Sequence, residues 1–262
     1  MDLQQAAFFD LDKTIIATSS ATAFSRGFLA EGMLTRRSVL RAAYAQIAYL
    51  LGAADEDQTE RLRVQLSRMV AGWEVAQVSH VVEETLHEAI DPTVYAEAVA
   101  LIERHHEEGR DVVIVSASSS EIVEPIAAVL GADHVISTRM SVVDGRYTGE
   151  IDFYAYGENK ATAIRELAEH RGYDLAHSYA YSDSITDAPM LGLVGHAYAV
   201  NPDRVLRRRA QDQGWGVLTF DRPVPLLAFA RRPAGWAALG VAALVVAGVA
   251  VGWYLGRRRP EA

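Results

Sequence analysis

The apolar positions divide the chain into a first strand, a helical stretch and a long alternating region. Residues 6–9 form a short apolar run that ends at Asp10, as a central strand of a parallel sheet does. From residue 17 to residue 90 the apolar residues recur at three-to-four spacing, with no convincing strand pattern. This spacing predicts helices, most plainly over residues 33–52, 59–73 and 78–90.

After Asp91 and Pro92, strand and helix patterns alternate. Helices are predicted over residues 93–108, about 119–131, about 159–170 and about 204–213. Strands are predicted over residues 111–116, 134–138, 178–183, 196–200 and 216–220. Residues 139–152 form a predicted hairpin with Asp144 and Gly145 in a two-residue turn. This alternation indicates a parallel sheet with helices on both faces.

The predicted fold is therefore of the α/β class, with a Rossmann-like sheet. Residues 1–16 and 92–222 form its core, because they carry the strands. The all-helical residues 17–91, inserted after the first strand, form a separate small domain that would cover the core.

The C-terminal part of the chain has a different pattern. Residues 235–256 contain no charged residue and are long enough to cross a ~30 Å hydrocarbon core as a helix. Arginine clusters flank this stretch, and Trp236, Trp253 and Tyr254 lie at its ends, where aromatic rings favour the membrane interface. A buried core helix is the alternative, but an uncharged stretch of this length between two arginine clusters favours a transmembrane helix.

This span implies a linker over residues 223–234 and a basic tail over residues 257–262. Because arginines lie on both sides, they do not decide which way the helix crosses. The N-terminus lacks the basic region and the cleavage site of a signal peptide. We therefore expect a cytoplasmic domain held at the cell membrane by a single C-terminal anchor.

Composition and charge narrow the classes of function. The 262 residues suffice for one large domain, or for a core with a smaller insert. The chain has no cysteine, which excludes disulfides, thiolate metal sites and a cysteine nucleophile. The net charge is −9, and from residue 201 onward 10 arginines face 4 acidic residues, so the acidic excess lies in the body of the chain. We expect no nucleic-acid partner, because such partners require a basic stripe on the folded domain.

Polar side chains follow three of the predicted strands, and in open parallel sheets binding sites form at these carboxyl ends. If the strands are neighbours, several carboxylates, a hydroxyl and an ammonium meet in one crevice. The residues are Asp10 and Asp12 after the first strand, Ser116 at the end of the second, Asp183 at the end of the strand over 178–183 with Asp187 after it, and Lys160 at a loop-to-helix junction.

An acidic cluster of this kind repels itself unless a cation binds. Oxygen ligands without His or Cys favour Mg²⁺, which commonly also binds a substrate phosphate. One carboxylate can attack phosphorus, and a second can donate a proton to the leaving oxygen and later activate water. Ser116 and Lys160 would bind the phosphoryl oxygens. Of the 25 basic residues only Lys13 and Lys160 are lysines, and both lie in these motifs.

The motifs resemble those of a known enzyme family. DLDKT at residues 10–14, the strand-end Ser116, Lys160 and SDSITD at residues 182–187 resemble, in this order, the four motifs of the haloacid dehalogenase superfamily of phosphatases. The helical insert after the first motif and the form of the last motif resemble its phosphoserine-phosphatase-like branch. The resemblance covers roughly residues 4–220 and implies a Mg²⁺-dependent phosphoric monoester hydrolase.

The resemblance also implies a role for each motif residue. Asp10 would be the nucleophile that forms an aspartyl-phosphate, and Asp12 the general acid and base, whose backbone carbonyl also binds Mg²⁺. Asp183 would be the third protein ligand of the metal. Asp187 would support the metal-bound waters and orient Lys160.

Phosphate contacts would come from Thr14, Ser116 and the backbone N–H of Ala117. Thr186 stands where many relatives in this branch carry Asn, so its role departs from the family pattern. The serines 118, 119 and 120 are interpreted as N-cap and turn residues rather than ligands.

The substrate depends on the insert, which would close over the crevice. Phosphoserine phosphatases carry an acidic residue shortly after the first motif, whereas this chain has none between Thr14 and Glu31. The apolar insert and the predicted anchor favour a lipid or amphipathic phosphate monoester, such as a lysophosphatidate or phosphatidylglycerophosphate. The alternatives are phosphoserine or another soluble metabolite phosphate, and a membrane-tethered binding protein without activity. The sequence makes no prediction of the oligomeric state.

Overall fold

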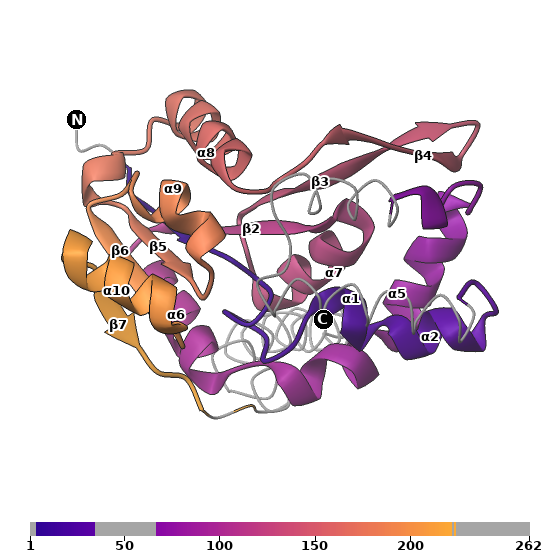
Figure 1. The fold of residues 1–262 in the computed structure, drawn as a ribbon, viewed down its shortest axis with the longest axis horizontal. Helices are drawn as coiled ribbons and strands as arrows, with labels where there is room; N and C mark the ends of the chain where they lie inside the picture. Colours follow the sequence, from indigo (N-terminus) through magenta and orange to yellow (C-terminus); the bar gives the residue numbers. More distant parts are fainter. Residues whose placement is uncertain (1–3, 35–66, 222, 224–262) are drawn as a thin grey trace, which may run out of the picture. The chain divides into compact units, whose positions relative to one another are not determined.

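The computed structural model describes residues 4–34, 67–221 and 223 (Figure 1). Its centre is a seven-stranded sheet with the strand order β4-β3-β2-β1-β5-β6-β7. The strands are β1 (Ala6–Phe9), β2 (Asp111–Ser119), β3 (His134–Val143), β4 (Arg146–Phe153), β5 (Tyr179–Ser182), β6 (His196–Val200) and β7 (Gly216–Leu218).

The described helices are α1 (Ser20–Ala23), α2 (Ser25–Ala30), α5 (Val75–Ile90), α6 (Ala96–Glu107), α7 (Ser120–Leu130), α8 (Glu158–Arg171), α9 (Ala188–Leu191) and α10 (Arg204–Gln213). Three short 3₁₀ turns complete the set, η1 (Asp91–Thr93), η2 (Leu175–His177) and η3 (Ile185–Asp187). Helix α5 begins three residues before the predicted segment 78–90, and α6, α7, α8 and α10 agree with the predicted helices to within a few residues. The short helix α9 was not predicted.

The sheet is parallel except at one edge, where β3 and β4 form an antiparallel hairpin. The prediction of a mainly parallel α/β sheet is therefore confirmed. The predicted two-residue turn is also confirmed, because Asp144 and Gly145 both have positive φ angles, 52° and 74°. Positive φ at both central residues is the geometry that matches the twist of the strands in a tight hairpin.

Helices cover both faces of the sheet (Figure 1). On one face α8, α9 and α10 pack on the strands through Ile164, Leu191 and Leu206, all fully buried. On the other face α6 and α7 contact β1, β2 and β3. The four residues of β1 have no exposed surface, because the strand lies in the middle of the sheet between two helical layers.

Strand β2 runs three residues past its predicted end at Ser116. Its register against β3 shifts between Ser116 and Ser119, so that Ser116 pairs with Ser137 and Ser119 pairs with Thr138. A bulge leaves residues unpaired and bends the strand. Apolar periodicity ends at Ser116, and for this reason the pattern did not reveal the continuation.

Part of the predicted helical insert is described, namely α1, α2 and α5. Helix α5 buries Val78, Val81 and Val82 and packs against α2 and α7. The predicted helix over 33–52 and most of that over 59–73 lie outside the described residues. Contacts place Met1–Val224 in one compact unit, so the boundaries of a separate small domain over residues 17–91 stay a prediction.

The C-terminal predictions also fall outside the described part of the chain. The structure does not describe the predicted span 235–256, the tail 257–262 or, apart from Pro223, the linker 223–234. The second unit defined by contacts, Pro225–Ala262, lies in the same undescribed part. Within the ranges that the structure describes, no helix has the length and apolarity to cross a membrane.

Candidate active site

Asp10 lies directly after β1, at the carboxyl end of the sheet. Its side chain is buried, with 6% of its surface exposed. The Lys160 Nζ donates to Asp10 Oδ1 at 2.7 Å, and the Thr14 hydroxyl donates to Asp10 Oδ2 at 3.1 Å. Both carboxylate oxygens therefore have a fixed partner, which holds the predicted nucleophile in one orientation.

Lys160 reaches Asp10 from the first turn of α8. The residue before this helix, Gly157, has φ 55° and ψ −126°, a conformation that side chains with a Cβ avoid. This glycine lets the chain turn from the hairpin into the helix, which brings Lys160 to Asp10 at the carboxyl end of the sheet. The ammonium is buried and also donates to Asp187 Oδ2 at 2.9 Å.

The loop after β5 completes the cluster. Asp187 accepts a second bond from the Ser182 hydroxyl at 2.7 Å, and both residues are buried. The backbone N–H of Asp183 donates to the Thr14 hydroxyl at 3.0 Å. Thr14 thus joins the loop after β1 to the loop after β5, and the structure brings Asp10, Thr14, Lys160, Asp183 and Asp187 into one network.

Asp12 is held by two serines that the sequence did not single out for this purpose. The backbone N–H of Ser20, at the start of α1, donates to Asp12 Oδ1 at 2.9 Å. The Ser118 hydroxyl donates to Asp12 Oδ2 at 3.3 Å and bonds to the Ser20 hydroxyl at 2.7 Å. In addition to its place in the turn, Ser118 therefore links the bulged end of β2 to Asp12.

Ser116 is buried at the end of the apolar part of β2, and its Oγ accepts a bond from the backbone N–H of Ser118 at 3.2 Å. The Thr138 hydroxyl of β3 donates to the Ala117 carbonyl at 2.7 Å, which holds the bulged segment against the neighbouring strand. The sequence contains a signal for this bulged segment, namely the four serines around Ala117. It does not tell which of these side chains point toward the site.

Two predicted residues are placed differently from the cluster. Lys13 is exposed and has φ 60°, an uncommon conformation for a residue with a side chain. Burial raises the pKa of Asp183, and the charge of Lys13 opposes this rise. The Thr186 hydroxyl bonds to the Ser184 hydroxyl at 2.8 Å within the same turn. The predicted roles of these and the other site residues stay predictions.

The buried network holds more negative than positive charge. Two carboxylates, Asp10 and Asp187, contact the ammonium of Lys160, and the charge of Asp183 acts on Asp10 in the same network. Burial raises the pKa of Asp10 to about 8, although Lys160 opposes this shift, and the pKa of Asp183 to about 6. Burial lowers the pKa of Lys160, but the charges of Asp10 and Asp187 outweigh it and raise the pKa above its usual value. A further cation near Asp10 and Asp183 would keep both ionised.

The donor set fits the cation that the motifs predict. The predicted ligands are the carboxylates of Asp10 and Asp183 and the main-chain carbonyl of Asp12, all oxygen atoms, which suit Mg²⁺. In the described ranges no group of three or more His, Asp or Glu side chains is arranged to hold a metal. This finding is compatible with the prediction, because only two of the predicted ligands are side chains.

Asp12 differs from Asp10 in its hydrogen-bond partners, which are Ser20 and Ser118 and not the Lys160 ammonium. Burial raises the pKa of Asp12 above its usual value, although the bonds from Ser20 and Ser118 favour the charged form. A raised pKa keeps a proton on a carboxyl group at higher pH, as a general acid requires. The two aspartates of the first motif therefore have different surroundings in addition to different positions.

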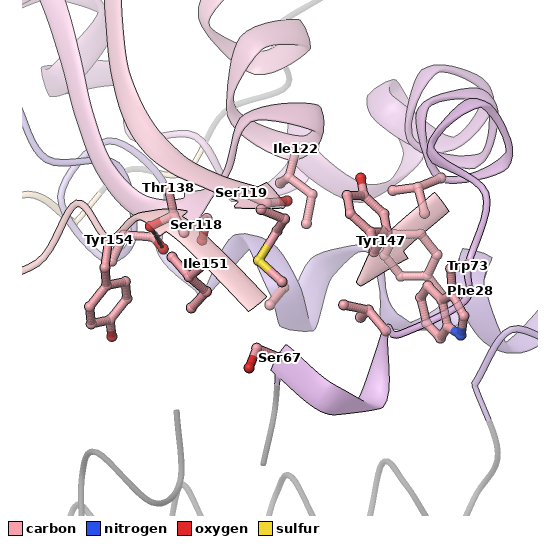
Figure 2. Close-up of a pocket in the computed structure, with 15 residues that line it drawn as sticks. Phe28, Ser67, Trp73, Ser118, Ser119, Ile122, Thr138, Tyr147, Ile151 and Tyr154 are labelled. Atoms are coloured by element: carbon pink, nitrogen blue, oxygen red, sulfur yellow. Dashed lines mark hydrogen bonds between the residues drawn. The ribbon is translucent and has the colours of Figure 1, made fainter. Parts of the chain in front are cut away.

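A cavity of about 330 Å³ opens beside residues 117–119, the bulged end of β2 (Figure 2). It extends from Ala117, Ser118 and Ser119 to the aromatic side chains of Phe28 and Trp73. The bulged end of β2, residues 117–119, therefore lies between the predicted phosphate site and this cavity.

Residues 7–192 match the family of haloacid dehalogenase-like hydrolases. A probable phosphatase of Mycobacterium tuberculosis is 58% identical over 247 residues, which cover 94% of this chain and 86% of the relative. The inhibition of morphological differentiation protein of Streptomyces azureus is 56% identical over 263 residues, with 97% and 94% covered. A phosphoserine phosphatase of M. tuberculosis is 37% identical over 222 residues, with 84% and 72% covered.

Solved structures agree with this relationship. A protein of unknown function from Bordetella pertussis has a TM-score of 0.73 and 28% identity, with 83% of this chain and 99% of that chain covered. A phosphoserine phosphatase bearing an analogue of its phospho-aspartyl intermediate has a TM-score of 0.59 and 17% identity, with 85% and 96% covered, which shows a shared fold. The chain belongs to the family of haloacid dehalogenase-like hydrolases and is a phosphoric monoester hydrolase.

Proposed function

We propose that this phosphatase hydrolyses its substrate through an aspartyl-phosphate on Asp10, and that Asp12 moves the proton. The observation that carries the proposal is the pairing of Asp10 with the buried Lys160, two residues before a carboxyl group whose pKa is raised. One carboxylate is oriented by an ammonium and the other tends to keep its proton, as a nucleophile and a general acid require.

In the first half-reaction an oxygen of Asp10 attacks phosphorus and the bond from phosphorus to the ester oxygen breaks. Asp12 donates its proton to this oxygen, and the alcohol leaves. In the second half-reaction Asp12 takes a proton from water, the water oxygen attacks phosphorus, and the bond to Asp10 breaks. Inorganic phosphate is released, and both carboxyl groups return to their first state.

Lys160 and the end of β2 act on the phosphoryl group. The Lys160 ammonium, 2.7 Å from Asp10, would offset the charge that the phosphoryl oxygens carry into the transition state. Ser116 and the backbone N–H of Ala117 would orient the same group. Mg²⁺, held by Asp10, Asp183 and the carbonyl of Asp12, would supply positive charge that shields the carboxylates from the phosphate.

The fine identity of the substrate and the place of the reaction belong to the same proposal. The uncharged stretch 235–256 supports a membrane anchor, and an anchored enzyme with an apolar insert supports a lipid or amphipathic phosphate. Carbonate extraction of membranes from cells that produce the full-length chain tests the anchor. Retention in the membrane pellet is expected, and release with the peripheral proteins would contradict it.

Phosphoserine is the second candidate, because one relative is named as a phosphoserine phosphatase. A phosphate-release screen of amino-acid, sugar and lipid phosphates compares the two candidates directly. A clear preference for phosphoserine would exclude the lipid proposal. Absence of release from every phosphate would favour the remaining alternative, a tethered binding protein.

The catalytic proposal is tested with the full-length chain, Mg²⁺ and p-nitrophenyl phosphate. Wild type is expected to release nitrophenol and to become transiently phosphorylated, in a linkage that hydroxylamine cleaves as it does acyl phosphates. Asp10→Asn is expected to show neither activity nor labelling. Equal activity of the two proteins would contradict the proposal.

A further inference from the structure

The cavity beside the bulged end of β2 has two chemically different ends (Figure 2). At one end lie the hydroxyl residues Ser118, Ser119 and Thr138, and at the other Phe28, Trp73 and Tyr147 gather. The rings of Phe28 and Trp73 are 6.0 Å apart between centroids. The remaining described lining is mainly aliphatic and includes Ile122, Met140 and Ile151. Ile122 lies between the two ends, and Ile151 lies near Ser118 (Figure 2).

None of the described residues that line this cavity is charged. An amine or carboxylate placed inside would lose its water without gaining an opposite charge from these residues, which is strongly unfavourable. An apolar group, in contrast, would be stabilised by removal of its surface from water. The described lining therefore favours an uncharged, apolar occupant.

The aromatic end is held by backbone bonds between the insert and the hairpin. The N–H of Gly72 donates to the Tyr147 carbonyl at 2.8 Å, and the N–H of Tyr147 donates to the Trp73 carbonyl at 3.1 Å. The N–H of Val75 donates to the Gly145 carbonyl at 3.0 Å. These bonds join a segment of the insert to the β3–β4 hairpin, so the aromatic wall is part of the fold before any ligand binds.

The hydroxyl end adjoins the proposed chemistry. Ser118 lines the cavity, and its hydroxyl also donates to Asp12, the proposed proton donor to the leaving oxygen. Ala117, whose backbone N–H is proposed to bind the phosphoryl group, lines the cavity as well. Ser118 therefore adjoins both the proposed proton donor and the cavity.

We propose that this cavity binds the leaving group of the substrate and selects phosphate monoesters of uncharged, apolar alcohols. The proposal rests on the proposed function and names its substrate class. The volume of about 330 Å³ is roughly twice the ~150 Å³ of an apolar cavity that holds benzene. It suits a short alkyl chain, an aryl group, or the first part of an acyl chain.

Glu31 does not line this cavity, so it does not supply a carboxylate there for the amine of phosphoserine. The residue lines a separate pocket, together with Gly32, Glu74 and Arg146. The acidic residue that an amino-acid phosphate would require for its amine is therefore absent from the described lining of the cavity that adjoins Ser118.

A homologous series tests the proposal. The full-length chain with Mg²⁺ is given ethyl, butyl and hexyl phosphate, phosphoserine, 1-naphthyl phosphate and a short-chain lysophosphatidate. We expect kcat/KM to rise roughly fourfold for each added methylene that is buried, and phosphoserine to be poorer than butyl phosphate. A preference for the alkyl and aryl phosphates or for the lysophosphatidate over phosphoserine supports the proposal. Comparison of the soluble esters with the lysophosphatidate shows whether the apolar group comes from a soluble alcohol or from a lipid.

Variants on one strand provide the matched comparison. Met140→Ala removes an apolar wall of the cavity, whereas Val142→Ala shortens a side chain of the same strand that is 44% exposed. The ratio of kcat/KM for hexyl over ethyl phosphate should fall roughly tenfold in Met140→Ala and stay unchanged in Val142→Ala. The ratio is insensitive to the fraction of folded protein, and Trp73→Leu provides a second test of the aromatic end.

The two proposals fail in different ways. If no ester is hydrolysed, the proposed function fails. If ethyl and hexyl phosphate are hydrolysed equally well, or if phosphoserine is preferred, the enzyme stands and the apolar selection is overturned. An unchanged ratio in both Met140→Ala and Trp73→Leu would likewise overturn it.

Discussion

Two buried polar clusters lie next to each other around β1 and β5, and each contains a buried basic residue, which is charged in one cluster and neutral in the other. The first contains Asp10, Lys160 and Asp187. The second contains His105 of α6, Arg110 and Tyr181, beneath Phe9, the residue that precedes Asp10. Phe9 stacks on Tyr181 with 4.4 Å between ring centroids, and His105 packs edge-on against Phe9 at 5.8 Å.

In the second cluster the hydrogen bonds determine one neutral tautomer. Arg110 Nε donates to His105 Nδ1 at 2.8 Å, so this ring nitrogen is the acceptor. The proton therefore lies on Nε2, which is 2.9 Å from the Tyr181 hydroxyl and donates to it. Burial, followed by the charge of Arg110, lowers the pKa of His105 to about 4.

The comparison shows that burial alone does not decide the charge state. Burial disfavours charge on Lys160 and on His105 alike. Lys160 stays charged because two carboxylates contact it, whereas His105 stays neutral because its nearest charged neighbour is a cation. The first cluster is suited to chemistry with charged groups, and the second is suited to supporting the strand that carries Asp10.

The largest expected effect comes from removing the charge of Asp10. Asp10→Asn should lower kcat/KM for p-nitrophenyl phosphate by about 10⁴-fold or more, because the amide is a poor nucleophile. Asp152→Asn, at an exposed position of β4, is the matched control and should keep wild-type activity. Steady-state kinetics with circular dichroism as a check of folding measure both, and substantial activity of Asp10→Asn would contradict the assignment.

Lys160→Met should damage the fold as well as the activity. The variant leaves the carboxylates of Asp10 and Asp187 buried without their cation, which costs about 3–5 kcal/mol of the free energy of unfolding. Urea denaturation measures this loss. Adding Asp187→Asn should recover part of it, because one uncompensated charge is removed.

The control for this prediction lies on the same helix. Arg165 makes an exposed ion pair with Glu158, so Arg165→Met should change the free energy of unfolding by no more than about 1 kcal/mol. Equal losses in Lys160→Met and Arg165→Met would mean that the buried ammonium is not required to balance the cluster.

Ser118→Ala should have a smaller effect, limited to the orientation of Asp12. Loss of one hydrogen bond of about 1 kcal/mol corresponds to a roughly fivefold lower kcat. Ser25→Ala is the matched control, since it also removes one bond of a serine hydroxyl, to the Thr22 carbonyl, that does not involve Asp12. A comparable loss of kcat in both variants would remove the special role given to Ser118.

The smallest effect is a difference in pH dependence. The pKa of His105 is about 4 in the folded protein against 6.5 ordinarily, so the unfolded chain takes up the proton first as pH falls. The contribution of His105 to stability is full above pH 6.5 and is lost progressively down to about pH 4, with a slope that reaches on the order of 1 kcal/mol per pH unit.

His105→Gln should therefore flatten the decline in the free energy of unfolding between pH 6.5 and 4. His106→Gln makes the same substitution at the next residue of the helix, whose ring is partly exposed and contacts Asp133, and serves as the matched comparison. Urea denaturation across this pH range distinguishes the two. Parallel curves for wild type and His105→Gln would show that His105 does not titrate as the geometry indicates.

Much of the sheet was predictable because its signals are local. The run ending at Asp10, the turn at Asp144 and Gly145 and the alternation after Pro92 each depend on neighbouring residues. The grouping of Asp10, Lys160 and Asp187 followed from the rule that parallel strands end at one edge. The bulge in β2 had no such signal, since apolar periodicity stops before it.

The sequence by itself determined the family, the α/β class and which residue types meet at the carboxyl end of the sheet. Only the tertiary structure decided that Ser20 and Ser118 hold Asp12, and that His105 is a neutral core residue rather than a surface one. It also decided that Phe28, Trp73 and Tyr147, far apart in the chain, line one cavity. The physical reason is that hydrogen-bond partners and burial depend on which side chains the fold brings together, and residue order carries no such distances.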